Sequence, residues 1–573
     1  MVSPAREEPA DPPLVALVSL LTLSTFLTQF VFRAADDNRL TSWQWVFADA
    51  DLARMSGFLV AGILVAYALS RVRLPERRAL AVLALTSFLA GAVFWREPEV
   101  IVDAARYFTQ AKHLLIYGIA HFVEGWGREI GAWTDLPLVP GLFGLTFALG
   151  GETRVAVQVL TTLLFSGTVV LTYLLGKTLW DGTVGLYAGA LLLGMPYLLT
   201  QVPLMLVDVP AMFLFMLAVL TVTCALRRGG GRWVASASAA VALAAWSKYS
   251  TWLWLTVLPV IVVVHLGREP RLILRRGAVI ALAPLLATGV VVFLKHDVIS
   301  AQLGLLQSFQ LPGLRRWQES AASTFLFQIH PFVTAAALYS GVVALRKRDW
   351  RYAIIAWVWL PVALLRVERI RYLVPVLPML ALLAGYGLRE VRSERIRRFA
   401  AACIVVSSLT IGVFGYLPHL MRVSAVNLKE AGEFLDSVPT GAVEVVALPQ
   451  PRSGINPAVS VPLLDLFTRK SIVYQDGPES PAPTDTIEQS PLRFTWEHRS
   501  PGYYGSRASS VREDAAVVVI SARAGESLPE SVERKIADRR LARSFQVSDD
   551  WFQYQTLVRI YLPAAWAPTG RRG

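Results

Sequence analysis

Charged residues are scarce in this chain of 573 residues, and cysteine is almost absent. Asp, Glu, Lys and Arg together make up 17% of the sequence, whereas soluble proteins carry about 25%, so a soluble multidomain enzyme is disfavoured. The two cysteines, Cys224 and Cys403, both lie in apolar runs, which excludes a disulfide framework and a cysteine-based zinc site. Hydrophobic residues make up 54%, which excludes low-complexity disorder. The composition indicates a polytopic membrane protein.

Apolar runs long enough to cross a bilayer recur along the chain. We predict about thirteen transmembrane helices, at 14–33, 53–70, 79–95, 154–176, 184–200, 204–226, 233–248, 250–267, 276–294, 323–345, 352–366, 371–388 and 398–417. The first follows an acidic, proline-rich start and lacks a basic region and a cleavage site, so we expect a retained helix rather than a signal peptide. The apolar stretch 137–150 is short, and we expect a half-helix that dips into the outer face.

Arginine-rich turns indicate the orientation, because short cytoplasmic loops collect Lys and Arg. Five such turns separate the predicted helices, at 71–78, 227–232, 268–276, 346–348 and 389–398. If all five are cytoplasmic, the N-terminus is cytoplasmic and the C-terminus is periplasmic or extracellular, in the inner or plasma membrane. The net charge of +13 then reflects topology, so we expect a bilayer as partner and no nucleic acid.

The chain divides into three predicted regions. Residues 1–78 form a two-helix membrane extension, residues 79–426 form the transmembrane domain with its first outer loop at 96–153, and residues 427–573 form an extracytoplasmic α/β domain. In this last region no run could span a bilayer. Its β-rich runs (443–448, 515–520 and 554–562) alternate with helix-like stretches (428–438 and 531–541).

Acidic residues gather on the predicted outer face. A charged side chain beside apolar membrane helices costs free energy, so each of these acids is expected to have a structural or functional role. Asp103 lies between the third predicted helix and an amphipathic surface helix at 104–123. Asp135 precedes the half-helix, and Asp208 stands between apolar residues at the start of a later span. The ordinary alternative for each is a helix N-cap.

Basic residues on the same face run against the orientation rule and suggest an anionic ligand. Lys248 lies at the outer end of two apolar runs, and the basic turn 366–372 ends in Arg369-Ile-Arg371-Tyr372. Arginine suits phosphate because its fork donates two parallel hydrogen bonds. The alternative is a salt bridge within the turn or to an outer acid.

These residue types fit one chemistry well. A carboxylate takes the proton of an acceptor hydroxyl, which attacks the anomeric carbon of a sugar on a lipid phosphate, while Arg and Lys stabilise the departing phosphate. His330 is a weaker candidate, because a lone histidine beside a span is more often a satisfied interior residue than a catalyst.

The order of the motifs resembles the GT-C membrane glycosyltransferases, especially the branch with protein O-mannosyltransferases and lipid A aminoarabinose transferases. The acid after a first-loop span is followed by a half-helix, by Asp-Val-Pro at 208–210 and by Arg-Tyr-Leu-Val-Pro-Val-Leu-Pro at 371–378. The resemblance covers about residues 80–390. It departs from the family where Asp103 is followed by Ala104 instead of Glu, and where 135–138 reads Asp-Leu-Pro-Leu.

The resemblance implies a polyprenyl-phosphate-linked sugar donor and inversion at the anomeric carbon, with an outer domain that positions a protein, lipid or glycan acceptor. The expected catalytic residues are Asp103 and Asp208. The expected substrate-binding residues are Arg106, Tyr107, Asp135, Lys248, His330, Arg369, Arg371 and Tyr372. We expect no required cofactor; Asp103 and Asp208 would be the ligands of a divalent ion, but no ligand spacing demands one.

Rival functions remain open at this stage. A polysaccharide polymerase or ligase with a lipid-pyrophosphate donor would share the arginine cluster. A transporter or lipid-glycan flippase would carry acids near mid-span and a repeat between its halves, and the sequence has neither pattern. A non-catalytic membrane subunit would use the outer domain for docking.

Overall fold

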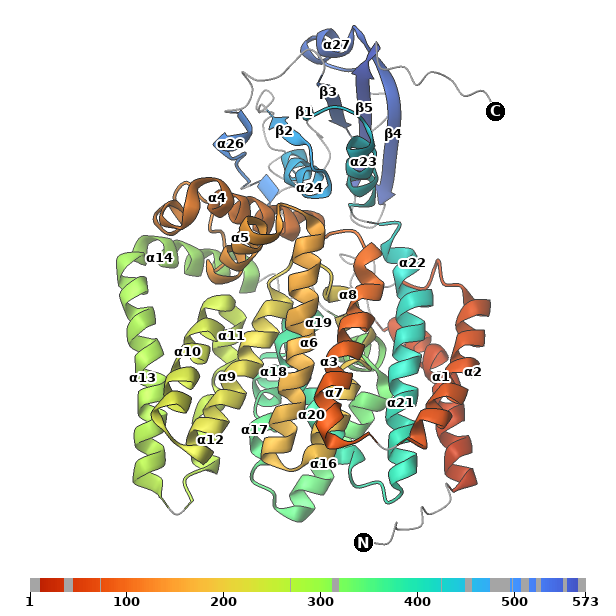
Figure 1. The fold of residues 1–573 in the computed structure, drawn as a ribbon, viewed down its shortest axis with the longest axis vertical. Helices are drawn as coiled ribbons and strands as arrows, with labels where there is room; N and C mark the ends of the chain where they lie inside the picture. Colours follow the sequence, from red (N-terminus) through yellow and green to blue (C-terminus); the bar gives the residue numbers. More distant parts are fainter. Residues whose placement is uncertain are drawn as a thin grey trace.

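A computed structural model describes residues 11–35, 45–72, 74–267, 269–311, 319–423, 425–448, 456–474, 495–496, 498–505, 515–521, 527–549 and 554–564. A bundle of long helices carries a smaller domain with a β-sheet at one end (Figure 1). This confirms the predicted fold class, a polytopic α-helical membrane protein with a C-terminal α/β domain. The number of membrane crossings stays a prediction.

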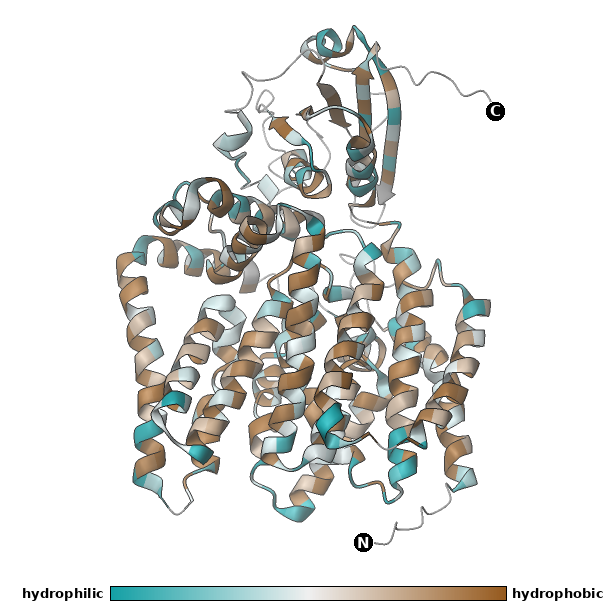
Figure 2. Ribbon diagram, viewed as in Figure 1, coloured by the Kyte–Doolittle hydropathy of each residue, from teal (hydrophilic) through white to brown (hydrophobic). Residues whose placement is uncertain are grey.

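Eight helical segments in the described residues are long and apolar enough to cross a membrane. Figure 2 shows most of their length in brown, the colour of hydrophobic residues. They are α1 (Pro12–Arg33), α2 (Leu52–Ser70), α3 with the 3-10 turn η2 (Glu76–Arg96), α6 (Arg154–Leu179), α9 (Asp208–Arg228), α13 (Pro270–Leu294), α19 to α20 (Ile370–Leu388) and α21 to α22 (Glu394–Leu420). The other predicted spans are shorter or broken.

Prolines and extended residues explain the breaks. Pro196 divides the predicted span 184–200 into α7 (Gly182–Leu192) and α8 (Pro196–Gln201), since proline favours a helix start. Lys248, with extended backbone, separates α10 (Gly231–Ser247) from α11 (Tyr249–Trp254), which α12 (Val257–Val264) follows. Pro331 begins α16 (Pro331–Lys347) after the π-helix η4 (Ser323–Ile329). The predicted span 352–366 is divided into α17 (Tyr352–Ala356) and α18 (Trp359–Leu365).

Burial distinguishes central helices from peripheral ones. Within the most apolar part of each helix, 89% of the residues of α9 and of α19 to α20 are buried, against 17% for α1 and α2 and 11% for α13. The apolar side chains that remain exposed on the peripheral helices are suited to contact with lipid. Helix α2 nevertheless packs closely on α21 (Glu394–Ile411): a Cβ added at Gly62 would overlap Val406.

Contacts between helix ends bring basic turns together at the end of the bundle remote from the sheet domain (Figure 1). Arg398 Nε donates to the carbonyl oxygen of Ser70 at 2.8 Å, and Lys347 pairs with Glu390 at 2.6 Å. The turns that follow α2, α16 and α20 (Leu377–Leu388) therefore share one face of the bundle.

Three helices form a layer between the bundle and the sheet domain: α4 (Ile101–Gly125), α5 (Leu138–Gly150) and α14 (His296–Leu305) (Figure 1). The helix predicted at 104–123 is confirmed as α4, with a bend at Gly118, whose φ of 82° suits glycine. Its place on the membrane surface stays a prediction. The short helix predicted at 137–150 is confirmed as α5, whose 13 residues fall short of the ~20 that a crossing needs.

The sheet of the outer domain has the order β2-β1-β3-β5-β4. Its strands are β1 (Ala442–Ala447), β2 (Ser471–Tyr474), β3 (Ala516–Ser521), β4 (Arg539–Asp549) and β5 (Tyr554–Pro563). The helices are α23 (Val426–Ser437), α24 (Ser460–Phe467), α26 (Gly502–Gly505) and α27 (Glu530–Ile536). All three predicted β-runs are confirmed. The predicted helix at 531–541 is wrong beyond Ile536, because β4 pairs antiparallel with β5 from Arg539 onward.

A buried ion pair joins the outer domain to α4. Lys112 of α4 lies 2.5 Å from Asp465 of α24 and 2.5 Å from Glu152, and only 3% of its surface is exposed. Tyr504 of α26 donates to the same Asp465 carboxylate at 2.8 Å. The helix that carries Asp103 is thus held from above by the outer domain.

Candidate active site

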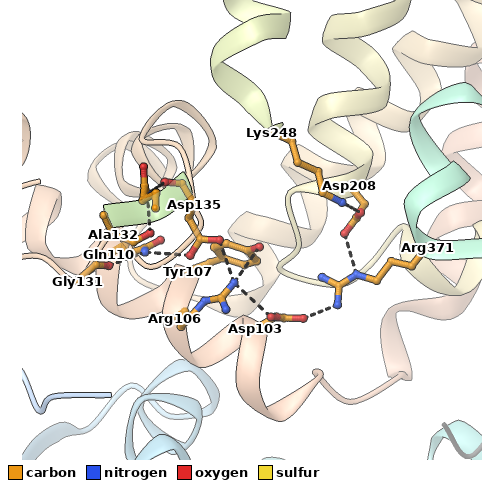
Figure 3. Close-up of polar contacts among 11 residues, drawn as sticks. Asp103, Arg106, Tyr107, Gln110, Gly131, Ala132, Asp135, Asp208, Lys248 and Arg371 are labelled. Carbon is orange, nitrogen blue, oxygen red and sulfur yellow. Dashed lines mark hydrogen bonds and ion pairs between the residues drawn. The ribbon is translucent and has the colours of Figure 1, made fainter. Parts of the chain in front are cut away.

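A chain of alternating charges lies where α4 meets the bundle, and Figure 3 shows its members pointing toward one another. Arg106 Nη2 lies 2.9 Å from Asp135 Oδ1 and 3.3 Å from Asp103 Oδ1. Arg371 contacts Asp103 Oδ2 through Nη1. The order from one end to the other is Asp135, Arg106, Asp103, Arg371, Asp208 and Lys248.

The three carboxylates differ in access. The Asp103 side chain is 18% exposed, whereas that of Asp135 is 6% exposed and that of Asp208 is fully buried. Asp103 lies in the first turn of α4 and is not its N-cap, which is Val100. Of the three acids, Asp103 is therefore the one that a substrate reaches most readily.

Asp208 and Asp135 both form ion pairs with cationic side chains and do not cap helices. Asp208 is the first residue of α9, where the helix dipole favours a negative charge. Its carboxylate lies 2.5 Å from Lys248 Nζ and 3.2 Å from Arg371 Nε. Asp135 accepts a second hydrogen bond from Gln110 at 3.2 Å. The N-cap alternative fails for both, since the N-caps are Val207 and Pro137.

Two tyrosines flank the charged chain. Arg106 Nη2 lies 3.4 Å from the Tyr107 hydroxyl, and Arg369 Nη1 lies 3.4 Å from the Tyr372 hydroxyl. Lys248 Nζ also lies 5.7 Å from the centre of the Tyr372 ring, within cation–π range. These contacts bring Tyr107, Arg369 and Tyr372 beside the predicted catalytic residues.

His330 lies apart from the charged chain in its hydrogen bonding. It is the N-cap of α16, and its Nδ1 accepts from the Phe332 amide at 3.2 Å. Its Nε2 lies 3.1 Å from the Ser407 hydroxyl, and the residue is fully buried. This is the satisfied interior histidine that the sequence offered as the alternative.

Two buried glutamates that the sequence did not single out hold the site's backbone. Glu99 accepts from Arg154 Nε through one oxygen and from the Met205 amide through the other, each at 2.9 Å. It thereby ties the start of α4 to the segment before α9. Glu319 accepts from the Ile370 amide at 2.9 Å and so holds the turn that precedes Arg371.

A sequence signal existed for only one of these glutamates. Glu99 stands in the same acidic segment as Asp103 beside an apolar helix, a placement that needs a reason. Glu319 lies in a predicted outer loop, where acids are ordinary, and it accepts from the side chain of Gln328 and from a backbone amide 51 residues away.

The charges around each acid shift its pKa differently. Burial alone would raise the pKa of Asp103, but the guanidinium groups of Arg371 and Arg106 outweigh it and hold that pKa well below the usual aspartate value. For Asp135, burial outweighs the opposing charge of Arg106, and its pKa is raised. Burial also raises the pKa of Tyr107, which keeps the phenol protonated.

Metal binding has little support from side-chain grouping. The described part of the chain contains no cluster of three or more His, Cys, Asp or Glu residues that could hold a metal ion. Asp103 and Asp208 contact different nitrogens of the same Arg371 guanidinium. A divalent ion held between these two predicted ligands would have to displace that guanidinium.

Residues 135–294 match a family model described as dolichyl-phosphate-mannose-protein mannosyltransferase. No curated protein matches the sequence. Among solved structures, ArnT from Cupriavidus metallidurans bound to undecaprenyl phosphate aligns over 84% of this chain and 97% of its own, with a TM-score of 0.52 and 13% identity. The chain shares its fold with ArnT. AglB from Archaeoglobus fulgidus, in complex with an inhibitory peptide and a dolichol-phosphate, aligns with a TM-score of 0.44 and 11% identity, over 77% of this chain and 69% of its own.

The fold shared with ArnT and the family match over residues 135–294 confirm the resemblance that the motif order indicated. The matched residues 135–294 include Asp135, Asp208 and Lys248, whereas Asp103 and Arg371 lie outside them. The charged chain therefore unites residues from within the family match with residues from both sides of it.

Proposed function

We propose that this protein is a membrane glycosyltransferase that moves a sugar from a polyprenyl-phosphate-linked donor to an acceptor hydroxyl. The observation that carries the proposal is Asp103, a partly exposed carboxylate held between Arg106 and Arg371 beneath the outer domain. The GT-C fold and the undecaprenyl phosphate bound to ArnT support a lipid-linked donor.

Asp103 is the proposed general base. It accepts the proton of the acceptor hydroxyl while the hydroxyl oxygen attacks the anomeric carbon from the face opposite the phosphate. The bond between that carbon and the phosphate oxygen breaks, and its electron pair leaves with the lipid phosphate. Because a single displacement inverts the centre, the product has the opposite anomeric configuration to the donor.

Arg371 and Lys248 are the proposed phosphate-binding groups. Both contact Asp208, whose carboxylate is fully buried and has no access to an acceptor. We infer that Asp208 orients these two cations rather than taking the proton itself. Arg369 and Tyr372 extend the same group of donors.

Donor binding also tunes the base. In the free protein Arg371 helps to hold the pKa of Asp103 well below its usual value, which makes a weak base. A donor phosphate that shares Arg371 weakens this hold, and the pKa of Asp103 rises toward the range in which proton abstraction is effective. The base is thus strengthened when the donor is in place.

We also infer that the site lies on the periplasmic or extracellular side of the membrane. The grouping of basic turns at the opposite end of the bundle supports this orientation. Labelling of a cysteine introduced at the exposed Arg348 by a membrane-impermeant maleimide in sealed cells would contradict it.

The first test is sugar transfer by purified protein in lipid nanodiscs. Radiolabelled sugars on synthetic polyprenyl monophosphate are offered with a mixture of glycan, lipid and peptide acceptors, and donor consumption is measured with and without acceptor. We expect turnover by the wild type and a loss of about 10²–10⁴-fold in Asp103→Asn, the usual contribution of a general base.

The matched control is Asp297→Asn. Asp297 is an exposed aspartate in the first turn of α14, as Asp103 is in the first turn of α4, and its removal should leave turnover unchanged. Consumption of polyprenyl-pyrophosphate sugars alone would contradict the monophosphate donor. Equal turnover by Asp103→Asn and the wild type would contradict the assigned base.

A further inference from the structure

A pocket of about 470 Å³ opens between α4, the loop that follows it and the outer domain. Arg106, Gln110 and His113 line it from α4, and Trp133 lines it from the loop. Residues 498–502 of the outer domain close the other side. Its volume is in the range of small-molecule sites.

Among the buried polar atoms at this pocket that have no hydrogen-bond partner in the described structure are Arg106 Nε, Gln110 Oε1 and His113 Nδ1. Their residues are 8%, 2% and 6% exposed. Buried polar groups are nearly always hydrogen-bonded, and these three side chains come from successive turns of one helix. Their grouping points to a polar ligand that completes them.

The unpaired atoms differ in kind. Arg106 Nε carries a proton and donates, whereas Gln110 Oε1 accepts. Burial and the nearby His121 lower the pKa of His113 to about 4, so its ring is neutral at pH 7 and donates or accepts according to its tautomer. A phosphate or carboxylate would need donors only. Hydroxyl groups, which donate and accept together, match this mixture.

Trp133 supplies a flat apolar surface at the same place. Its ring centre lies 5.5 Å from the Arg106 guanidinium carbon, and its backbone has a φ of 50°. Such a conformation is costly for a large side chain, and strain of this kind gathers at binding sites. A ring face beside mixed donors and acceptors suits a pyranose, which has apolar faces and a hydroxylated edge.

We propose that this pocket binds the acceptor as a saccharide unit, so that the new bond joins sugar to sugar. The inference rests on the proposed function. Arg106 contacts Asp103 through Oδ1 and Arg371 contacts it through Oδ2, so the pocket and the proposed phosphate-binding cations lie on opposite sides of the base (Figure 3). A sugar hydroxyl reaching past Arg106 gives its proton to Asp103 as its oxygen bonds to the donor's anomeric carbon.

The test is photocrosslinking to the full-length protein in nanodiscs. The probes are a neutral hexoside, a uronoside and a Ser/Thr peptide, each with the same diazirine, and adducts are mapped by mass spectrometry. We expect glycoside adducts on the segments 106–133 and 498–502. Trp133→Gly, which suits the positive φ, and His113→Leu should each lower their yield about tenfold, as the loss of a stacking face or a hydrogen bond would.

Two further variants distinguish acceptor binding from sugar transfer. Glu124→Gln alters an exposed residue of α4 and should crosslink like the wild type, and Asp103→Asn should crosslink but not turn over. Peptide adducts in the pocket, or no glycoside adducts there, would overturn the inference, and sugar transfer to the peptide would still leave the proposed function standing. Glycoside adducts without consumption of any donor would overturn the proposed function instead.

Discussion

At the residue scale, the side chain of Arg371 holds two acids in a fixed relative position. Its Nη1 contacts Asp103 and its Nε contacts Asp208, so a single rigid plane sets the spacing of an accessible acid and a buried one. Lysine would present one point charge on a flexible stem and could not keep both contacts in a fixed plane. The guanidinium is therefore needed for its shape as well as for its charge.

We expect Arg371→Lys to lower turnover about 10²–10³-fold, the usual loss when one oriented transition-state donor is removed. The measurement is kcat for donor consumption at saturating acceptor. Arg366→Lys is the control, because Arg366 is exposed in the same turn and should tolerate the change. An Arg371→Lys enzyme with the wild-type kcat would show that charge alone suffices.

The pKa of Asp103 predicts two different acid limbs. In the free protein this pKa is well below its usual value because of Arg371 and Arg106, so kcat/KM for the donor should fall only in strong acid. In the donor complex the phosphate shares Arg371 and the pKa rises, so the acid limb of kcat should lie at higher pH. Profiles of both constants between pH 3 and 8, a range chosen to include the ordinary aspartate value of about 3.9, test this; coincident limbs would contradict it.

At the element scale, structure that depends on neighbours in sequence was predictable. The amphipathic pattern of α4 and the shortness of α5 are local properties, and both helices formed where expected. Strand β4 was missed because its residues 539–541 read as the end of a helix until β5 pairs with them. Local propensity gives way to such long-range pairing.

The charged residues of the site were found because charges near a membrane stand out against apolar sequence. Glu319 was missed because it lies in a predicted loop and holds a backbone amide of a distant segment, at Ile370. Every residue has an amide, so no residue type marks such a partner. Only the fold reveals which buried acids hold the site together.

Glu99→Gln is expected to damage both stability and activity. The amide cannot balance the charge of Arg154, which is 8% exposed, and leaving one member of a buried pair costs about 3–5 kcal/mol. The start of α4 and the segment before α9 lose their shared anchor, and a displacement of ~1 Å can cost 10²-fold in rate. Thermal stability in nanodiscs and kcat measure the two effects. Glu433→Gln, at an exposed site in α23, is the control, and an unchanged kcat in Glu99→Gln would contradict an anchoring role.

At the scale of the whole molecule, the outer domain and α4 share one hydrophobic core. Phe108 of α4, Phe143 of α5 and Leu463 of α24 belong to the same buried cluster. The ion pair between Lys112 and Asp465 also joins α4 to α24. Helix α4, which carries the proposed base, is thus packed as part of the outer domain as much as of the bundle.

We expect Lys112→Met to loosen this contact, since it leaves Asp465 buried without its cation, at a cost of about 3–5 kcal/mol. The double variant Lys112→Met/Asp465→Leu should recover much of the loss, because replacing a buried pair with apolar residues is often neutral. Hydrogen exchange of α4 and α24 reports the contact. A double variant that exchanges as fast as Lys112→Met would assign the loss to packing rather than to the unpaired charge.

The alternation of charges in the site has a consequence for what happens after chemistry. Three acidic and three basic side chains balance in charge. Under the proposed function, an arriving lipid phosphate must therefore compete with carboxylates that already pair with these cationic side chains. Once the sugar has gone, the lipid phosphate can carry a second negative charge and would bind the same cations more strongly than the donor did. Asp103, on returning its proton to solvent, regains its attraction for Arg371 and competes with the spent carrier. The site thus contains its own displacing ligand, and the rate at which the empty lipid leaves is set in part by the acid that acts as the base.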